Sequence, residues 1–117
     1  MQVLVVDDLP RARQALKSLL ATDPRVTGVA VARDDQDALA QLENAPADVV
    51  IIDVAPLDTN RIATIRQIKQ CWPTVRVIVL ALYAESITAA LSAGADAFVS
   101  KGEPASRLLS ALTDRPS

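Results

Sequence analysis

Three aspartates and one lysine stand where apolar segments of the chain end, and together they could support phosphoryl chemistry. Asp7 and Asp8 follow the first apolar segment, Asp53 ends the third, and Lys101 follows the last. Carboxylates that lie close together repel one another, and a divalent cation relieves that repulsion. A carboxylate beside such a metal is a competent nucleophile toward phosphorus, while the metal and a lysine can neutralise the phosphoryl oxygens.

The available ligand types favour Mg²⁺ or Mn²⁺ as the cofactor. The chain contains no His and a single Cys, so a metal would be held by oxygen atoms alone, as these two ions prefer. The same composition excludes a histidine general base, an internal disulfide and a zinc site built from cysteines.

Each of these charged residues also has a purely structural interpretation. Asp7 and Asp8 could cap a helix that begins near Pro10, and a single lysine such as Lys101 is most often a solvated loop residue. Asp53 is harder to explain this way, because Asp is depleted in strands and costly to bury without a partner. The four positions together favour a site over coincidence.

The elements that must position these residues alternate regularly. Buried strands are expected where apolar residues run almost without interruption, and apolar residues at helical spacing fill the intervals and follow the last strand. Such alternation predicts an α/β fold, a doubly wound five-stranded parallel sheet of order 2-1-3-4-5 flanked by five helices, flavodoxin-like. The carboxyl ends of its strands would then gather the three acids and the lysine in one crevice. The five expected strands are residues 2–6, 26–31, 49–52, 75–82 and 97–100.

Size and composition limit what the chain can be. Its 117 residues fit one compact domain, 1–117, and a net charge of −2 with a pI near 4.9 argues against direct nucleic-acid binding by this domain. The first residues lack the pattern of a signal peptide, and no apolar run approaches the roughly 20 residues that span a bilayer. We therefore expect a cytoplasmic protein with no membrane partner.

Three segments of the chain, VLVVDD, DVVIIDVAPLDTN and GADAFVSK, resemble the signature blocks of the receiver domain of two-component response regulators. The resemblance implies that Asp7, Asp8, Asp53 and the backbone carbonyl of Ala55 hold Mg²⁺. It implies that Asp53 accepts a phosphoryl group from a sensor histidine kinase or a phosphotransfer protein, and that Lys101 contacts the phosphate. Such a domain catalyses at most its own phosphorylation and dephosphorylation, so it is not an enzyme with an external substrate.

The chain departs from the family pattern at positions that transmit or tune the signal. Receivers normally carry Thr or Ser where this chain has Ala81, and that hydroxyl links the phosphate to the output surface. Phe98 keeps the switch aromatic without a tyrosine hydroxyl, or is an ordinary core residue. Ala55 and Tyr83 occupy the positions that tune attack of water on the phosphate, although Tyr83 could equally pack against the fourth helix.

The loop after Asp53 departs as well. The family usually has Met-Pro and then Gly a few residues later, where this chain has Pro56, Leu57 and Arg61. A proline one position early and an arginine in place of a glycine predict a different path for the backbone beside the acceptor.

Several functions remain open on the sequence alone. The first is a phosphoacceptor with atypical output coupling, and it looks most like receivers attached to helix-turn-helix domains that regulate transcription. The second is a phosphorylation-independent interaction module, with a homodimer through the fourth helix, fifth strand and fifth helix. An aspartate-nucleophile phosphatase is disfavoured because Ala55 replaces its second acid. A dinucleotide-binding domain is disfavoured because no glycine-rich loop follows the first strand.

Overall fold

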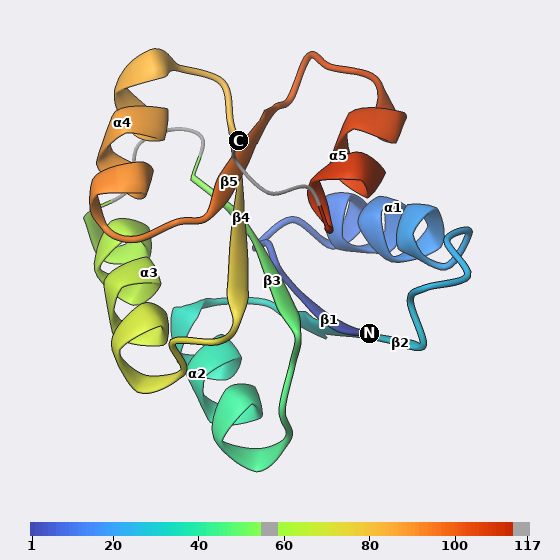
Figure 1. Cartoon of the computed structure of the whole chain (residues 1–117), viewed down its shortest axis with the longest axis horizontal. Coiled ribbons are helices and arrows are strands. Elements are labelled where there is room, and N and C mark those ends of the chain that lie inside the picture. The colour runs from blue at the N-terminus through green and yellow to red at the C-terminus, as the bar shows by residue number, and fades with distance from the viewer. Residues whose placement is uncertain (55–58, 114–117) are drawn as a thin grey trace.

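Five short apolar segments form one parallel sheet in the computed structural model, which describes residues 1–54 and 59–113 (Figure 1). The order is β2-β1-β3-β4-β5 and every neighbouring pair is parallel, which confirms the predicted fold class. Only the ends of β2, β3 and β4 differ from the prediction, by one or two residues, because Val26 and Val75 lie in turns before their strands. The strands are β1 (Gln2–Val6), β2 (Gly28–Ala32), β3 (Val49–Asp53), β4 (Arg76–Ala81) and β5 (Ala97–Ser100).

Five helices cover the sheet on both faces. In Figure 1, α1 and α5 lie on one side of the strands and α2, α3 and α4 on the other. Local signals set several of the helix ends: Pro10 occupies the first turn of α1, and the Asp34 side chain accepts a 2.8 Å hydrogen bond from the backbone N–H of Asp37. The helices are α1 (Pro10–Leu20), α2 (Asp35–Asn44), α3 (Thr59–Cys71), α4 (Ala84–Ser92) and α5 (Ala105–Ala111).

Helix α4 ends at Ser92, and a glycine follows its C-cap residue Ala93. Gly94 has φ 111°, a left-handed conformation that side chains rarely adopt, and the N–H of Ala95 bonds to the carbonyl of Ala90 at 3.0 Å. A Cβ at Gly94 would also lie 3.1 Å from the side chain of Lys69. This turn directs the chain from α4 into β5, and so determines where the residue after β5 is placed.

The sheet has an apolar core on each face, because alternate residues of a strand point in opposite directions. Val3 and Val5 belong to the core under α1 and α5, whereas Leu4 and Val6 belong to the core under α2, α3 and α4. All five residues of β3 are buried. The strands are therefore packed against an apolar core on both faces, and this packing fixes the backbone from which the polar side chains at their carboxyl ends extend. No helix among the described residues is both long and apolar enough to cross a membrane.

An ion pair between the buried Asp23 and the exposed Arg25 fastens α5 to the turn after α1. The Arg25 guanidinium contacts the Asp23 carboxylate at 2.7 Å, and it also donates to the carbonyl of Leu109 at 3.0 Å and to the hydroxyl of Thr113 at 2.7 Å. The hydrogen bonds that the side chain and the backbone N–H of Arg25 donate to the Asp23 carboxylate lower the pKa of Asp23 from 3.8 to about 2.

We expect Asp23→Asn to lower the free energy of unfolding at neutral pH. A carboxyl group whose pKa is lowered in the folded state stabilises the fold above its unfolded pKa of 3.8, and this contribution is lost as the pH falls toward about 2. The difference in the free energy of unfolding between the variant and wild type should therefore become smaller as the pH falls from 3.8 to about 2. Urea unfolding measured at a series of pH values tests this, and a difference that stayed constant down to pH 2 would contradict it.

Candidate functional site

Asp53 and Lys101 meet at the carboxyl end of the sheet. Asp53 is the last residue of β3 and is 7% exposed, and the ammonium group of Lys101 forms an ion pair with its carboxylate. Lys101 follows β5, so its side chain must pass over the end of β4, which lies between β3 and β5. The residue at that end is the small, fully buried Ala81, whose carbonyl accepts a 3.0 Å hydrogen bond from the backbone N–H of Lys101.

Asp7 lies beside this pair and is almost completely buried. Its carboxylate accepts a 2.9 Å hydrogen bond from the backbone N–H of Leu9, which is the N-cap residue of α1. Leu9 itself makes no side-chain cap, so the Asp7 carboxylate satisfies a backbone N–H at the start of α1, which is part of the structural role that the sequence allowed. Burial raises the pKa of Asp7 above 3.8, and the nearby charge of Asp53 raises it further.

Asp8 has a different environment. Its side chain is 74% exposed and one oxygen lies 4.0 Å from a guanidinium nitrogen of Arg61. The structure thus brings Asp7, Asp53 and Lys101 into one contact group and leaves Asp8 at its margin. Across the described part of the chain, no three acidic, His or Cys side chains lie close enough together to hold a metal ion. Ala55, Pro56 and Leu57 lie outside the described residues.

Arg61 is a member of this region that the sequence indicated only as a departure from the family pattern. It lies in the first turn of α3, is buried, and donates a 2.6 Å hydrogen bond to the backbone carbonyl of Asp53. Its Nε also lies 2.9 Å from a carboxylate oxygen of Asp35, at the start of α2. The signal was present in the sequence, because Arg61 shares a helical face with Ile65 and Ile68 and therefore points inward.

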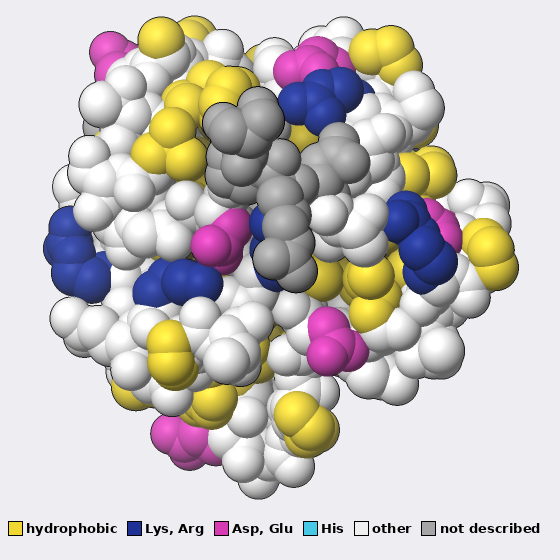
Figure 2. Space-filling model, in the orientation of Figure 1, with side chains coloured by type: hydrophobic (Ala, Val, Ile, Leu, Met, Phe, Trp, Pro, Cys, Tyr) yellow, Lys and Arg dark blue, Asp and Glu magenta, His cyan; other side chains and the backbone are white. Residues whose placement is uncertain are grey.

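The switch positions Ala81 and Phe98 and the tuning position Tyr83 lie in or beside a region with exposed apolar side chains. Ala81 is fully buried, whereas the next two residues, Leu82 and Tyr83, are each 54% exposed. Phe98 is 37% exposed, so it is not an ordinary core residue. Leu91 on α4 is also exposed. Figure 2 shows hydrophobic side chains gathered over α4 and the connection from β4 to α4, at the upper left of that view.

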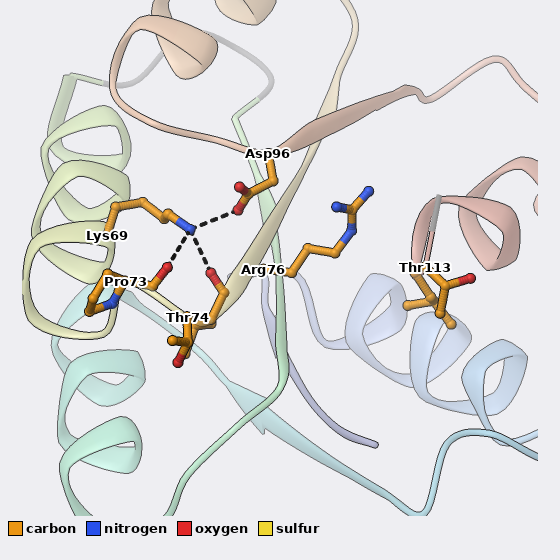
Figure 3. Close-up of a pocket in the computed structure, with 8 residues that line it drawn as sticks. Lys69, Pro73, Thr74, Arg76, Asp96 and Thr113 are labelled. Atoms are coloured by element: carbon orange, nitrogen blue, oxygen red, sulfur yellow. Dashed lines mark hydrogen bonds and ion pairs between the residues drawn. The ribbon is translucent and has the colours of Figure 1, made fainter. Parts of the chain in front are cut away.

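A hollow of about 570 Å³ at the opposite, amino end of the strands has a structural role (Figure 3). Lys69 points into it and donates hydrogen bonds to the carbonyls of Pro73 and Val75 and to the carboxylate of Asp96, at 3.2, 2.8 and 2.9 Å. Asp96 also accepts a 2.8 Å bond from the N–H of Val77. These contacts tie the end of α3 to the starts of β4 and β5.

Comparison with known proteins agrees with this arrangement. The family model of the response regulator receiver domain matches residues 3–113, nearly the whole chain. The chain belongs to this family. Its receiver fold is also found in the crystal structure of a response regulator receiver domain protein from Clostridium thermocellum, with a TM-score of 0.81 and 27% identity over 95% of this chain and 90% of that one.

Two longer relatives contain a similar receiver. The transcriptional regulatory protein DegU of Brevibacillus brevis is 28% identical over 95% of this chain and 48% of its own length. A protein-glutamate methylesterase/protein-glutamine glutaminase of Symbiobacterium thermophilum is 39% identical over 86% of this chain and 28% of its own length. The chain thus spans half or less of these curated relatives, whose names indicate a transcriptional regulator and a methylesterase. A receiver domain is typically a signalling module and not an enzyme.

We expect Asp7→Asn to stabilise the receiver at neutral pH in the absence of divalent metal. A carboxyl group whose pKa is raised in the folded state contributes stability below its unfolded pKa of 3.8 and loses it as the pH rises through the folded value. The neutral amide keeps that stability, and its oxygen can still accept from Leu9. Urea unfolding in EDTA at neutral and at acidic pH measures the difference in the free energy of unfolding between Asp7→Asn and wild type. A variant that is less stable than wild type at pH 7 would contradict the prediction.

Proposed function

We propose that this receiver is a phosphoacceptor, which takes a phosphoryl group on Asp53 from the phosphohistidine of a sensor kinase or a phosphotransfer protein. The observation that supports this most directly is the buried Asp53 carboxylate, held by the Lys101 ammonium group beside Asp7. A carboxylate in this position is held in a fixed orientation for attack, and the ammonium group beside it can stabilise the negative charge of the phosphoryl oxygens.

In the transfer step, one carboxylate oxygen of Asp53 forms the new bond to phosphorus. The bond between phosphorus and the imidazole nitrogen of the donor breaks, and its electron pair stays on that nitrogen, which takes up a proton from solvent. Lys101 can stabilise the negative charge throughout the transfer, because its ammonium group already contacts the attacking carboxylate. It would exchange this contact for one to a phosphoryl oxygen.

The proposed cofactor is Mg²⁺ or Mn²⁺, on which the receiver family generally depends. Asp7, Asp8 and Asp53 would hold the ion, together with the backbone carbonyl of Ala55. Two features of the site fit a hard divalent cation: the side-chain donors are all oxygen atoms, and Asp7 is a buried carboxylate whose pKa is raised by burial and then by the charge of Asp53. Such an ion would neutralise charge on the phosphoryl oxygens.

The cellular role follows from the longer relatives. We propose that residues 1–117 act in the cytoplasm as the N-terminal receiver of a larger regulator, with an output in transcription as the name of DegU indicates for that protein. This receiver would not itself bind nucleic acid, since its net charge is −2.

The decisive experiment is the intact mass of the protein after incubation with Mg²⁺ and acetyl phosphate. We expect wild type to gain the mass of one phosphoryl group, and Asp53→Asn to gain none because the nucleophile is absent. Asp48→Asn is a matched control, since Asp48 is a carboxylate at the other end of β3, and this variant should be labelled like wild type. An equal adduct on Asp53→Asn would show that the acceptor lies elsewhere.

We also propose that coupling from Asp53 to the output surface is weak, because Ala81 has no hydroxyl to bond a phosphoryl oxygen. Ala81→Ser adds a single oxygen atom at this buried position and should restore part of the coupling. The expected result is a phosphodonor-dependent change in hydrogen exchange at α4 and β5, or in the sedimentation of a dimer, in the variant but not in wild type. A full response in wild type would show that the hydroxyl is dispensable here.

The exposed apolar patch favours a second candidate, a phosphorylation-independent interaction module that forms a homodimer through α4, β5 and α5. Leu82, Tyr83 and Phe98 expose much of their apolar surface at this face, and such patches mark protein contacts. Ala81 supports the same idea, since a face that needs no phosphate signal needs no switch hydroxyl. Absence of any phosphoryl adduct, with a stable dimer in the same buffer, would select this function.

A further inference from the structure

Arg61 is a buried cation inside the acidic region, and its contacts are specific. Only 9% of its side chain is exposed, although a guanidinium group loses much of its hydration when it is buried. It must therefore be stabilised by the groups around it. Those groups belong to three different elements of the fold, and all of them lie near the proposed metal site.

Each nitrogen of the guanidinium reaches a different neighbour. Nη1 donates to the backbone carbonyl of Asp53 at 2.6 Å, Nε contacts a carboxylate oxygen of Asp35 at 2.9 Å, and Nη2 lies 4.0 Å from a carboxylate oxygen of Asp8. Two of these three residues, Asp53 and Asp8, are proposed metal ligands. Arg61 thus occupies the space directly beside the acids that would bind the cation.

We propose that the positive charge of Arg61 competes with the divalent metal for the acid pocket, the region around Asp7, Asp8, Asp35 and Asp53. A guanidinium and a divalent ion near the same carboxylates repel each other, and the repulsion is strong where water is largely excluded. In addition, the carboxylate of Asp8 can turn fully toward a metal only if its attraction to Arg61 is overcome. This inference deepens the proposed function and rests on it for the identity of the metal site.

The charge balance of the region leads to the same conclusion. Among the described residues of this region, four carboxylates, those of Asp7, Asp8, Asp35 and Asp53, are accompanied by two basic groups, those of Lys101 and Arg61. Arg61 already offsets part of the repulsion among the acids, so a metal has less repulsion left to relieve. Mg²⁺ should consequently bind this receiver more weakly than it would without Arg61.

The test is the dissociation constant of Mg²⁺, and in parallel of Mn²⁺, measured by isothermal titration calorimetry at fixed ionic strength. Arg61→Gln removes the charge but keeps a side-chain amide that can donate to the Asp53 carbonyl. We expect this variant to bind Mg²⁺ about tenfold more tightly than wild type. Arg61→Lys, which retains the charge, should stay close to wild type.

Two controls separate the local effect from the general effect of charge. Arg66→Gln removes the same charge from an exposed position on the same helix and should leave the dissociation constant nearly unchanged. The double variant Asp35→Asn with Arg61→Gln removes one charge of each sign, so the net charge is unchanged and Asp35 is not left buried without its partner. It should still bind Mg²⁺ more tightly than wild type, and it serves if the single variant fails to fold.

Equal or weaker Mg²⁺ binding by folded Arg61→Gln, or by the double variant, would overturn the inference and indicate that Arg61 holds the metal ligands in place. This outcome is distinguishable from failure of the proposed function. A metal titration requires no phosphoryl transfer, so a protein that gains no adduct on Asp53 still reports the effect of Arg61. Conversely, normal labelling with an unchanged dissociation constant would refute the role of Arg61 alone.

Discussion

The ion pair between Asp53 and Lys101 is the interaction on which this site depends. It joins the ends of β3 and β5 across the end of β4, where the small residue Ala81 is buried. The pair neutralises a carboxylate that is nearly excluded from water, a position that would be costly without a cationic partner. It also places the cation where a phosphoryl group would need it.

The same edge of the sheet carries more charge than this one pair can balance. Asp7 is buried next to Asp53, and its pKa is raised by burial and, to a smaller extent, by the charge of Asp53. The N–H of Leu9 and the charge of Lys101 act in the opposite direction, and Arg61 of the neighbouring helix adds a second basic group beside Asp35 and the carbonyl of Asp53. Among the described residues, the acid pocket of this receiver therefore contains two basic groups, and a metal ion would have to bind in their presence.

Three of the positions that depart from the receiver pattern lie in or next to β4, α4 and β5, namely Ala81, Tyr83 and Phe98. Ala81 is buried without a hydroxyl, while Leu82, Tyr83 and Phe98 expose apolar area just beyond it. In the proposed function, phosphoryl acceptance and signal output use separate residues. Such a separation would explain how a receiver can keep its acceptor and lysine while its coupling residues change.

The sequence by itself determined the type and order of every helix and strand, because the change between continuous apolar runs and helical spacing is a local property of the chain. It also placed Asp7, Asp53 and Lys101 at one edge, since the ends of parallel strands must meet there. Only the tertiary structure decided that Asp8 lies at the margin and that Arg61 reaches Asp35 and the carbonyl of Asp53. Side-chain direction at a strand or helix end depends on packing against elements distant in sequence, and no local pattern encodes that packing.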